Sequence, residues 1–282
     1  MKFKYVVVGA GLAGITIAER IATQLHEKVL IIEKRPQIGG NVYDEYNDAG
    51  ILIQKYGPHT FNTNDKEVFD YVCQYCDWHE YQHRVMSYVN GNFVPMPISL
   101  ETINQLYNMN LSEDGMDAFI ESRKIKIDEI KTSEDVVLSQ GGQDIYEKFF
   151  KYFTIKQWGV SPAELESIKF IFETHDCESY QPVASTRWPM DYDYTRITEF
   201  KKLTGQKNDK TTILKEIPCD GEEPFYTFPT AEWKALAQQY RDLATQEENV
   251  IFLGRLAEYK YYDMDNVIRR SLDVFSEIAK VN

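Results

Sequence analysis

Apolar and polar positions follow two different periods near the start of the chain. Tyr5–Val8 and Val29–Ile32 are uninterrupted apolar runs, a pattern typical of strands that are buried in a parallel sheet. Between them, over residues 15–25, apolar side chains recur every three or four positions, as on one face of a helix. This segment is therefore predicted to form a strand–helix–strand unit with parallel strands.

A strand, a glycine and a helix are also predicted near the other end of the chain. Residues 250–253 form an apolar run, Gly254 follows, and helical spacing begins at about Met264. This order brings a second helix N-terminus to the same edge of a parallel sheet. Residues 1–85 and 245–282 are therefore predicted to build one discontinuous domain.

The middle of the chain has other patterns. Residues 96–150 carry mostly helical spacing, which predicts an inserted helical domain. Three strand-like runs follow within residues 151–235, which are predicted to hold a small antiparallel sheet and the substrate-binding region. The predicted fold class is α/β: a Rossmann-like domain of the glutathione reductase type, with the helical domain and the sheet domain inserted.

A glycine-rich turn joins the first strand to the first helix. Gly9, Gly11 and Gly14 stand in the spacing G-x-G-x-x-G. The first glycine permits a tight turn, the second lets a pyrophosphate approach the backbone, and the third lets the helix pack closely on the strand. The phosphates then lie on the free N–H groups at the helix start. The alternative is a strand–helix–strand unit that binds no nucleotide.

Two further features support a dinucleotide at this turn, and the second favours FAD. Glu33 ends the second strand, about 20 residues after the glycines, where a carboxylate accepts both hydroxyls of an adenosine ribose. Gly39 and Gly40 add a second backbone loop close to the expected flavin end. Together with Gly254 and the late helix, these residues predict an FAD-binding domain rather than an NAD-binding one.

Composition limits the partners and the compartment. The formal net charge of −13 argues against nucleic acid or an anionic membrane as a partner. No membrane-spanning stretch is predicted, and Glu19 and Arg20 interrupt the apolar start that resembles a signal peptide. Four cysteines without an obvious disulfide framework favour the reducing cytoplasm.

Cys73, Cys76, His79 and His83 invite comparison with a zinc site. Residues 65–78 have the apolar spacing of one helix, on which both thiols share the buried face. Ligands strung along a single helix cannot close a tetrahedron without a turn between the pairs. Buried core thiols, and no metal site, are therefore predicted.

Several polar and aromatic residues of the inserted part are candidates for a site. His59 is either a buried histidine with satisfied hydrogen bonds or a group near the flavin. Arg196 stands among tyrosines, either as a stacked surface pair or as a phosphate clamp in an aromatic pocket. Tyr226 and Tyr261 belong to tyrosine clusters that favour a core unless they converge on the cofactor.

Seven stretches of the sequence resemble the bacterial UDP-galactopyranose mutases. In chain order they are "VVGAGLAG", "IEKRPQIGGNVY", "KYGPHTFNTND", "FTIKQWG", "YTRITEF", "EEPFYTFP" and "FLGRLAEYKYYDMD". They extend over the whole chain, and the last is highly specific. The family interconverts UDP-galactopyranose and UDP-galactofuranose through N5 of reduced FAD, without net redox change. The resemblance thus implies an isomerase that acts on UDP-galactose and UDP-galactofuranose, and it suggests a homodimer.

The resemblance also implies roles for individual residues. The implied catalytic residues are Arg196, His59, Tyr226 and Tyr261. The implied substrate-binding residues are Phe149, Thr154, Trp158, His83, Arg196, Tyr226 and Tyr261, the first three around the uridine. The implied cofactor-binding residues are Gly9, Gly11, Leu12, Gly14, Glu33, Lys34, Gly40, Asn41, His59, Thr60, Gly254, Arg255, Asp263 and Met264.

The sequence departs from the family in three places. Asn62 replaces a usual histidine, and His83 stands where an asparagine is expected. The third departure follows Leu165, where the chain passes almost directly to "IKFIFETHD". Family members have a long segment there, which holds a second diphosphate-binding arginine, another tyrosine and a strand end of the nucleotide domain. The gap is on the order of a hundred residues, a domain-sized fraction, and it predicts weaker FAD retention and little or no mutase turnover.

Two other functions remain open. An amine-oxidase-like FAD oxidoreductase shares the glycine turn and the late helix, but it leaves Arg196 and Trp158 without a diphosphate or uracil to bind. A non-catalytic remnant that binds UDP or another nucleotide is the second alternative, and it would carry no flavin after purification.

Overall fold

The computed structural model describes residues 2–158, 167–190, 192–219 and 231–281. The chain divides into two compact units. Unit 1 contains Met1–Tyr46, Ile53–Glu80 and Phe225–Asn282, and unit 2 contains Asn47–Leu52 and Tyr81–Pro224. Both ends of the chain therefore lie in one unit.

Unit 1 begins with the predicted strand–helix–strand. β1 (Tyr5–Val8) and β2 (Val29–Ile32) pair in parallel, with Tyr5 opposite Val29 and Val8 opposite Ile32. α1 (Leu12–Gln24) connects them and begins directly after Gly11, its N-cap. The helix starts earlier than the apolar spacing indicates, because the glycine turn supplies its first residues.

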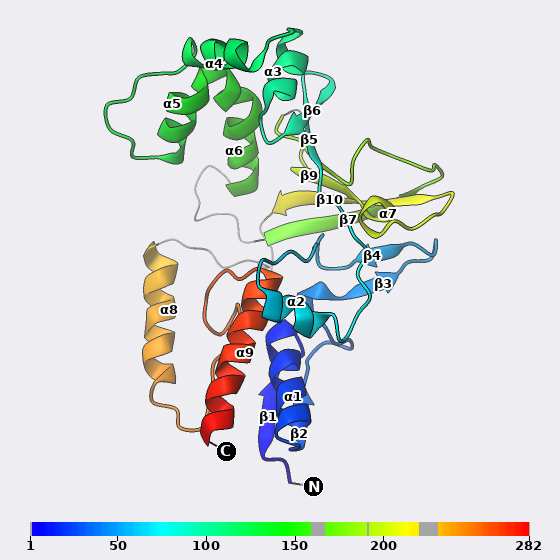
Figure 1. Ribbon diagram of the computed structural model, residues 1–282, viewed down its shortest axis with the longest axis vertical. Helices are drawn as coiled ribbons and strands as arrows, with labels where there is room; N and C mark the ends of the chain where they lie inside the picture. Colours follow the sequence, from blue (N-terminus) through cyan, green and yellow to red (C-terminus); the bar gives the residue numbers. More distant parts are fainter. Residues whose placement is uncertain (1, 159–166, 191, 220–230, 282) are drawn as a thin grey trace. The chain divides into compact units, whose positions relative to one another are not determined.

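Shorter elements follow, and two long helices complete this part of the chain (Figure 1). They are the 3-10 turn η1 (Gly40–Val42), β3 (Asp44–Tyr46), β4 (Leu52–Gln54), α2 (Lys66–Val72), α8 (Ala231–Ala244) and α9 (Met264–Val281). α2 begins where its sequence predicts. The Asp65 carboxylate caps it by accepting hydrogen bonds from the N–H groups of Glu67 and Val68, at 2.9 and 3.2 Å.

Helix α9 holds the core of unit 1 together. It lies beside α1 (Figure 1), where Val274 joins Ile17 and Ile21 in a buried cluster. A second buried cluster joins α9 to α2, and its members are Val68, Tyr71, Val72, Tyr262, Val267, Ile268 and Leu272. Residues from the two ends of the sequence therefore share one apolar core, which burial of their side chains stabilises.

Two predictions about the sheet of unit 1 are wrong. Residues 250–253 form no strand, and among the described residues β1 and β2 make a two-stranded sheet. An apolar run becomes a strand only when a neighbouring backbone pairs with it, and the run itself does not show whether that partner exists. The two strands are not buried on both faces either, because Val6 is 56% exposed and Val8 is 82% exposed.

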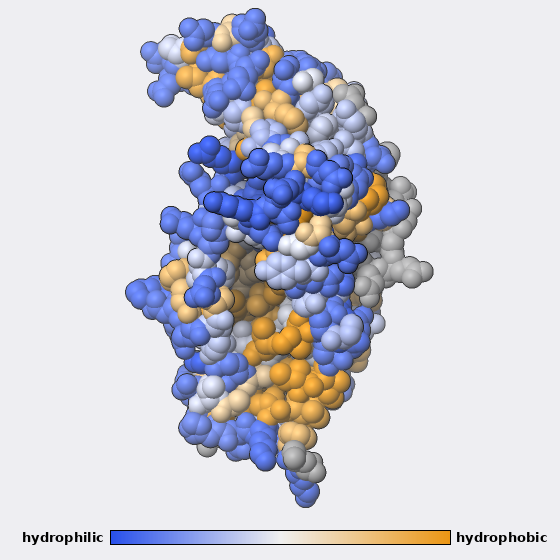
Figure 2. All heavy atoms as spheres, turned by 90° about the vertical axis from the view of Figure 1, so that its right-hand side faces the viewer, coloured by the Kyte–Doolittle hydropathy of each residue, from blue (hydrophilic) through white to orange (hydrophobic). Residues whose placement is uncertain are grey.

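The uncovered strand residues contribute to an apolar patch on unit 1. Its members from the strands and the run after α8 are Val6, Val8, Leu30, Ile31, Ile32, Val250, Ile251 and Phe252. Figure 2 shows apolar residues gathered over the lower half of the view, where unit 1 lies. Parallel strands normally have both faces covered, so this sheet has less cover than its sequence pattern indicates.

The helical part of unit 2 follows the pattern predicted for residues 96–150. Its helices are α3 (Leu100–Tyr107), α4 (Glu113–Glu121), α5 (Ser133–Ile145), the π-helical η2 (Tyr146–Lys151) and α6 (Tyr152–Trp158). Ser99, Ser112 and Thr132 cap α3, α4 and α5 through their side-chain oxygens. The buried residues Val89, Val94, Ile103, Ile145 and Phe149 form the core beneath them.

A six-stranded sheet forms the rest of unit 2. Its strands are β5 (Val85–Val89), β6 (Asn92–Met96), β7 (Ser167–His175), β8 (Ser185–Arg187), β9 (Arg196–Glu199) and β10 (Thr211–Cys219), in the order β6-β5-β8-β9-β10-β7. Four of the five pairings are antiparallel, and β5 pairs with β8 in parallel. The three predicted strand-like runs became β7, β8 and β10, and the short helix α7 (Phe200–Thr204) follows β9.

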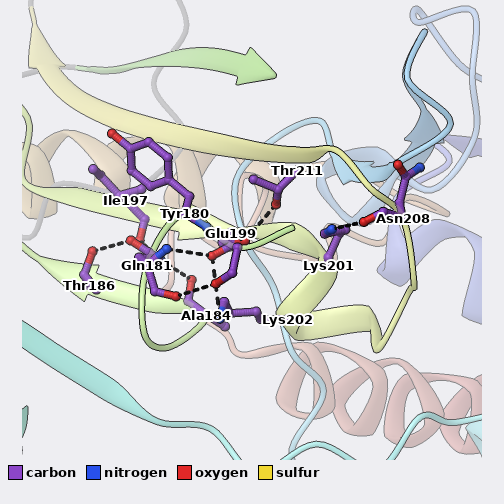
Figure 3. A network of polar contacts seen from close by, with 11 residues as sticks. Tyr180, Gln181, Ala184, Thr186, Ile197, Glu199, Lys201, Lys202, Asn208 and Thr211 are labelled. Carbon is purple, nitrogen blue, oxygen red and sulfur yellow. Dashed lines mark hydrogen bonds and ion pairs between the residues drawn. The ribbon is translucent and has the colours of Figure 1, made fainter. Parts of the chain in front are cut away.

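A buried carboxylate ties the loop before β8 to the end of β9 (Figure 3). Glu199 is fully buried, and its two oxygens accept hydrogen bonds from the backbone N–H groups of Tyr180 and Gln181, both at 3.1 Å. The Thr211 hydroxyl donates a third hydrogen bond, at 2.8 Å. These donors compensate the burial of the charge and fix the strand that carries Arg196.

The prediction of buried thiols is wrong. α2 ends at Val72, because hydrogen bonds at Gln74 and Tyr75 tighten to three-residue spacing, and Cys73 and Cys76 beyond it are exposed. No group of three or more His, Cys, Asp or Glu side chains suited to hold a metal lies within the described ranges. None of the helices that the structure describes is long and apolar enough to span a membrane.

Candidate functional site

The first glycine turn has the geometry that its spacing predicts. Gly9 has a φ of +99°, where an L side chain is strained, and its N–H donates to the Ile32 carbonyl at 2.8 Å. A Cβ atom on Gly14 would lie 2.0 Å from the Gly9 carbonyl oxygen. Glycine at position 14 therefore lets α1 begin this close to β1.

Gly11 leaves the start of α1 open. A Cβ atom there would meet nothing closer than the Cα of Gly40, at 3.9 Å, and its φ of −77° and ψ of 178° suit any residue. As the N-cap, Gly11 supplies no side chain to accept hydrogen bonds from the first turn of the helix. The N–H groups of that turn lack a side-chain cap, which is the arrangement that binds a phosphate.

A second glycine loop lies against the first. The Gly39 N–H donates to the Ala10 carbonyl at 2.8 Å, and Gly39 forms an isolated parallel bridge with Gly11. Gly40 has a φ of +61°, and a Cβ atom on it would lie 2.8 Å from the Cα of Gly11. The two loops therefore place bare backbone side by side, as the sequence predicts for a dinucleotide cradle.

Glu33 is fixed beside the first turn. Its Oε2 accepts a hydrogen bond from the Ala10 N–H at 2.7 Å, and its Oε1 accepts one from the Arg35 N–H at 2.9 Å. These backbone hydrogen bonds, that from Ala10 first, lower the pKa of the Glu33 carboxyl. The group is therefore a carboxylate with lone pairs to spare, directly after β2, with Lys34 following it.

Gly254, near the end of the sequence, packs against the start of α1, the helix that follows the first glycine turn. Gly254 has a φ of +99°, its N–H donates to Glu258 Oε2 at 3.0 Å, and a Cβ atom on it would lie 3.0 Å from the Cβ of Ala13. The glycine segments from the two ends of the sequence are therefore in contact at the start of α1.

A cavity of about 460 Å³ opens within unit 1. Three segments line it: η1, the loop of residues 56–64, and the segment that leads into α9. Of the residues implied by the family resemblance, the structure brings together around it Asn41, His59, Thr60, Arg255, Tyr261, Asp263 and Met264. The Arg255 guanidinium lies over the Tyr261 ring, at 4.8 Å from its centroid.

His59 is held at the wall of this cavity from three sides. Its N–H donates to Gln54 Oε1 at 2.8 Å, and its carbonyl accepts from Gln54 Nε2 at 2.7 Å. The ring Nε2 lies 3.2 Å from Asp44 Oδ1, and Nδ1 lies 3.2 Å from the Gly57 carbonyl. The side chain is both hydrogen-bonded and next to the cavity, so the two sequence alternatives do not exclude each other.

These features fit a dinucleotide. Two bare glycine loops meet at a helix start without a side-chain cap, a carboxylate stands beside them, and a cavity adjoins the second loop. A pyrophosphate suits the helix start, and a ribose suits Glu33. A planar ring system suits the cavity, whose walls are mostly polar and aromatic.

In unit 2, Arg196 is held by a carboxylate. Its Nε and Nη2 donate to Glu216 Oε1 and Oε2, at 2.6 and 2.7 Å. The Glu216 side chain is only 3% exposed, whereas that of Arg196 is 36% exposed. A buried, bidentate partner orients the guanidinium while its remaining face meets solvent. This orientation is compatible with a phosphate clamp, and the role of Arg196 stays a prediction.

The other predicted substrate residues have varied positions. His83 is exposed just before β5, and Thr154 is exposed on α6. Phe149 is 5% exposed and belongs to the core under the helices. Trp158 is the last residue of α6, but its side chain lies outside the described part, as does all of Tyr226. Their roles stay predictions.

Sequence reasoning missed two carboxylates that organise this region, Glu199 and Glu216. Glu199 lies between Thr198 and Phe200 in "TRITEF", and Glu216 shares its strand face with Leu214 in "TILKEIP". An acidic residue on a predicted strand face that is otherwise apolar was the available signal. Its partner was not visible, because Arg196 and Glu216 become neighbours only through the pairing of β9 with β10.

Two family models match this chain. The model of UDP-galactopyranose mutase (GLF) matches residues 165–261, and the model of an NAD(P)-binding Rossmann-like domain matches residues 7–75. The second covers the glycine turn, Glu33 and the second glycine loop. The first begins next to the predicted gap after Leu165, a junction that lies outside the described residues.

Solved structures are similar over almost their whole length. A crystal structure of reduced UDP-galactopyranose mutase has a TM-score of 0.73 and 11% identity, and the match covers 100% of this chain and 95% of that one. A putative protoporphyrinogen oxidase from Exiguobacterium has a TM-score of 0.63 and 10% identity, with 99% of both chains covered. At these identities the likeness shows the fold alone, an α/β fold with a Rossmann-like domain.

Sequence relatives identify the family of this chain, whereas the solved structures show only its fold. The dTDP-fucopyranose mutase of Escherichia coli is 26% identical, with 99% of both chains covered. The probable UDP-galactopyranose mutase of Klebsiella pneumoniae is 30% identical, with 96% of this chain and 93% of the relative covered. That alignment runs over 359 positions, more than the 282 residues of this chain, so internal residues of the relative have no counterpart here. By this identity over nearly the full length of both proteins, the chain belongs to the UDP-galactopyranose mutase family.

Proposed function

We propose that this protein is a sugar-nucleotide mutase, which interconverts UDP-galactopyranose and UDP-galactofuranose with reduced FAD as its cofactor. Family membership gives the reaction class. The single structural observation that carries the proposal is the dinucleotide cradle, in which Gly11, Gly40 and Gly254 bring three backbone segments together at the start of α1.

The residues proposed to hold FAD follow from their positions. The N–H groups after Gly11 meet the pyrophosphate, with Leu12 as the first residue of the helix, and Glu33 accepts the ribose hydroxyls. The residues that line the cavity surround the flavin end, with His59 at its wall and Arg255 beside it. Bound there in its reduced form, FAD would supply a nucleophile for the anomeric carbon of the sugar without net redox change.

The chain itself supplies orientation and charge. When the bond from the anomeric carbon to the UDP oxygen breaks, negative charge develops on the diphosphate. Arg196 stabilises that charge, because its guanidinium is always protonated and Glu216 holds it in one orientation. From the family resemblance, Tyr226 and Tyr261 are proposed to donate hydrogen bonds to the substrate.

The base of the nucleotide is proposed to lie beside α6. Phe149, Thr154 and Trp158 are the residues assigned to the uridine, and His83 to the substrate. The similarity to a dTDP-fucopyranose mutase makes a thymidine diphosphate sugar the second candidate substrate. Both substrates undergo the same ring change, so comparing UDP with dTDP in a binding titration distinguishes them.

The oligomeric state and the compartment are also proposals. A homodimer is inferred from the family resemblance, and light scattering of the purified protein tests it. A reducing compartment, the cytoplasm, is inferred from the four free cysteines, Cys73, Cys76, Cys177 and Cys219.

The test is conversion of UDP-galactofuranose into UDP-galactopyranose by the FAD-loaded protein, followed chromatographically with and without dithionite. We expect conversion that requires the reductant. Oxidation of an amine by the oxidised protein would instead support the amine-oxidase-like alternative. Binding of UDP without bound flavin would support the non-catalytic remnant.

A further inference from the structure

The sheet of unit 2 places two arginines directly opposite each other. Arg187 on β8 pairs in register with Arg196 on β9, and Arg196 pairs with Glu216 on β10. Residues directly opposite on neighbouring antiparallel strands point to the same face of a sheet. Both guanidinium groups and the single carboxylate therefore belong to one row on one face.

This row has more positive than negative charge. Glu216 binds Arg196 through both of its oxygens. No carboxylate among the described residues lies within salt-bridge distance of Arg187. Like charges directly opposite each other destabilise a sheet. A ligand of opposite charge would offset the repulsion between Arg187 and Arg196.

A third basic group adjoins the pair. Although His83 is largely exposed, partial desolvation lowers the pKa of its imidazole, and the positive charges of Arg196 and Arg187 lower it further. Burial, and then the charge of Arg196, lower the pKa of the Arg187 guanidinium as well. These directions agree with the register, which sets Arg187 opposite Arg196 on one face of the sheet. An anion bound there would relieve the repulsion.

The position of Arg187 relates this row to the proposed base-binding helix. Its guanidinium carbon lies 5.6 Å from the centroid of the Phe153 ring on α6. Phe153 stands directly before Thr154, which was assigned to the uridine. A nucleotide whose base lies along α6 would therefore have its phosphates within reach of the arginine row, since both features belong to unit 2.

We propose that Arg187 is a second diphosphate-binding residue, which with Arg196 forms a two-arginine clamp on the sheet face of unit 2. This inference rests on the proposed function and adds a residue that neither the sequence motifs nor the family resemblance assigned. Arg196 is oriented by Glu216 and contacts the anion from one side. Arg187 has no carboxylate partner, and the ligand's second phosphate takes that place.

Calorimetric titration of the full-length protein tests the clamp with UDP, uridine and inorganic pyrophosphate. Arg187→Met keeps the length of the side chain but removes the charge. We expect it to weaken UDP and pyrophosphate about 10- to 100-fold, the loss of one charge-assisted contact, while uridine binding stays within about 2-fold. Arg187→Lys should recover part of the affinity. Arg241→Met, on α8 of unit 1, is the control and should leave UDP and pyrophosphate binding unchanged.

Thermal melting separates this role from a structural one. Without ligand, Arg187→Met should melt at the same or a higher temperature than the wild type, because it removes a repulsion, and its stabilisation by UDP should shrink. If the wild type binds UDP and Arg187→Met binds it equally well, the clamp is wrong and the mutase proposal stands. If the wild type binds neither UDP nor dTDP, the proposed function fails and the clamp fails with it.

Discussion

Replacing Gly11 by alanine should separate the binding function of the first glycine turn from its structural function. A Cβ atom at this position meets no protein atom within 3.9 Å, and the backbone angles are those of an ordinary N-cap. At an N-cap, alanine is less favourable than glycine by roughly 1 kcal/mol, because replacing a polar cap by alanine costs about 0.5–2 kcal/mol and replacing it by glycine only a few tenths. We therefore expect the free energy of unfolding to fall by about 1 kcal/mol.

The same methyl group occupies the space in which a pyrophosphate approaches the backbone. A hydrogen bond from a backbone N–H to a charged group contributes about 1.5–3 kcal/mol. Loss of one such contact should weaken FAD binding about 10- to 150-fold. Titration of the apoprotein with FAD, followed by flavin fluorescence, measures this loss, and denaturant unfolding of the same samples measures stability.

Gly14→Ala is the matched control, because here the methyl group meets protein. Its Cβ would lie 2.0 Å from the Gly9 carbonyl oxygen, far inside van der Waals contact. We expect at least about 2 kcal/mol of destabilisation as α1 shifts from β1. The reasoning is refuted if Gly11→Ala binds FAD as tightly as the wild type, or if the two variants are equally stable.

Three further predictions concern single side chains. Val8→Thr should change the free energy of unfolding by less than about 0.5 kcal/mol and reduce binding of a hydrophobic dye, because Val8 is 82% exposed. The neighbouring Val7→Thr should destabilise the protein, and equal effects of the two changes would contradict the uncovered sheet face. Glu199→Gln should destabilise unit 2 by about 1–3 kcal/mol in denaturant unfolding, because an amide NH₂ replaces an oxygen that faces N–H donors. Glu121→Gln, at an exposed position, is the control, and equal stability of the two variants would argue against the hydrogen-bond network of Glu199. Burial alone would raise the pKa of Glu19, but hydrogen bonds from Arg20 and other donors lower it to about 2. Since the folded pKa lies below the unfolded one, the free energy of unfolding should fall as the pH drops from about 4.5 to about 2. Glu19→Gln should lose less stability than the wild type over that range.

The N-terminal unit was predictable because its signals are local. The apolar runs of β1 and β2, the glycine spacing and Glu33 lie within one short stretch. In the structure the runs pair as strands, the glycines allow close backbone approach, and Glu33 accepts a backbone hydrogen bond. The contact of Gly254 with Ala13 was inferred from a second pattern of the same kind. The predicted extent of the sheet was wrong, because residues 250–253 pair with no strand of the described residues.

The sheet of unit 2 was only partly predictable, because its organisation depends on pairing between distant strands. β5, β6 and β9 have only four or five residues each, whereas β7 and β10 have nine, so the short strands carry a weaker pattern. The pairing of Arg196 with Glu216, and its register with Arg187, result from this topology alone. The family resemblance pointed to Arg196, but the residues that orient it and oppose it emerged only from the fold.

The internal residues that this chain lacks relative to the Klebsiella protein should affect FAD binding and turnover. The exposed face of β1 and β2 marks where unit 1 lacks cover, and the alignment with the Klebsiella relative contains positions that this chain lacks. A less covered cradle should release FAD more readily, because parts of the site open more easily where few apolar contacts hold them. We therefore expect weaker FAD binding and slower turnover than in a relative of full length.

The central claim is that both ends of the chain form one FAD site, and equilibrium titration of the apoprotein with FAD tests it most directly. The absorbance of the flavin should shift and saturate at one FAD per chain, and Gly254→Val should weaken binding as Gly11→Ala does. If the wild type shows no saturable flavin binding, or if Gly254→Val folds and binds FAD unchanged, the two glycine segments do not serve one cofactor.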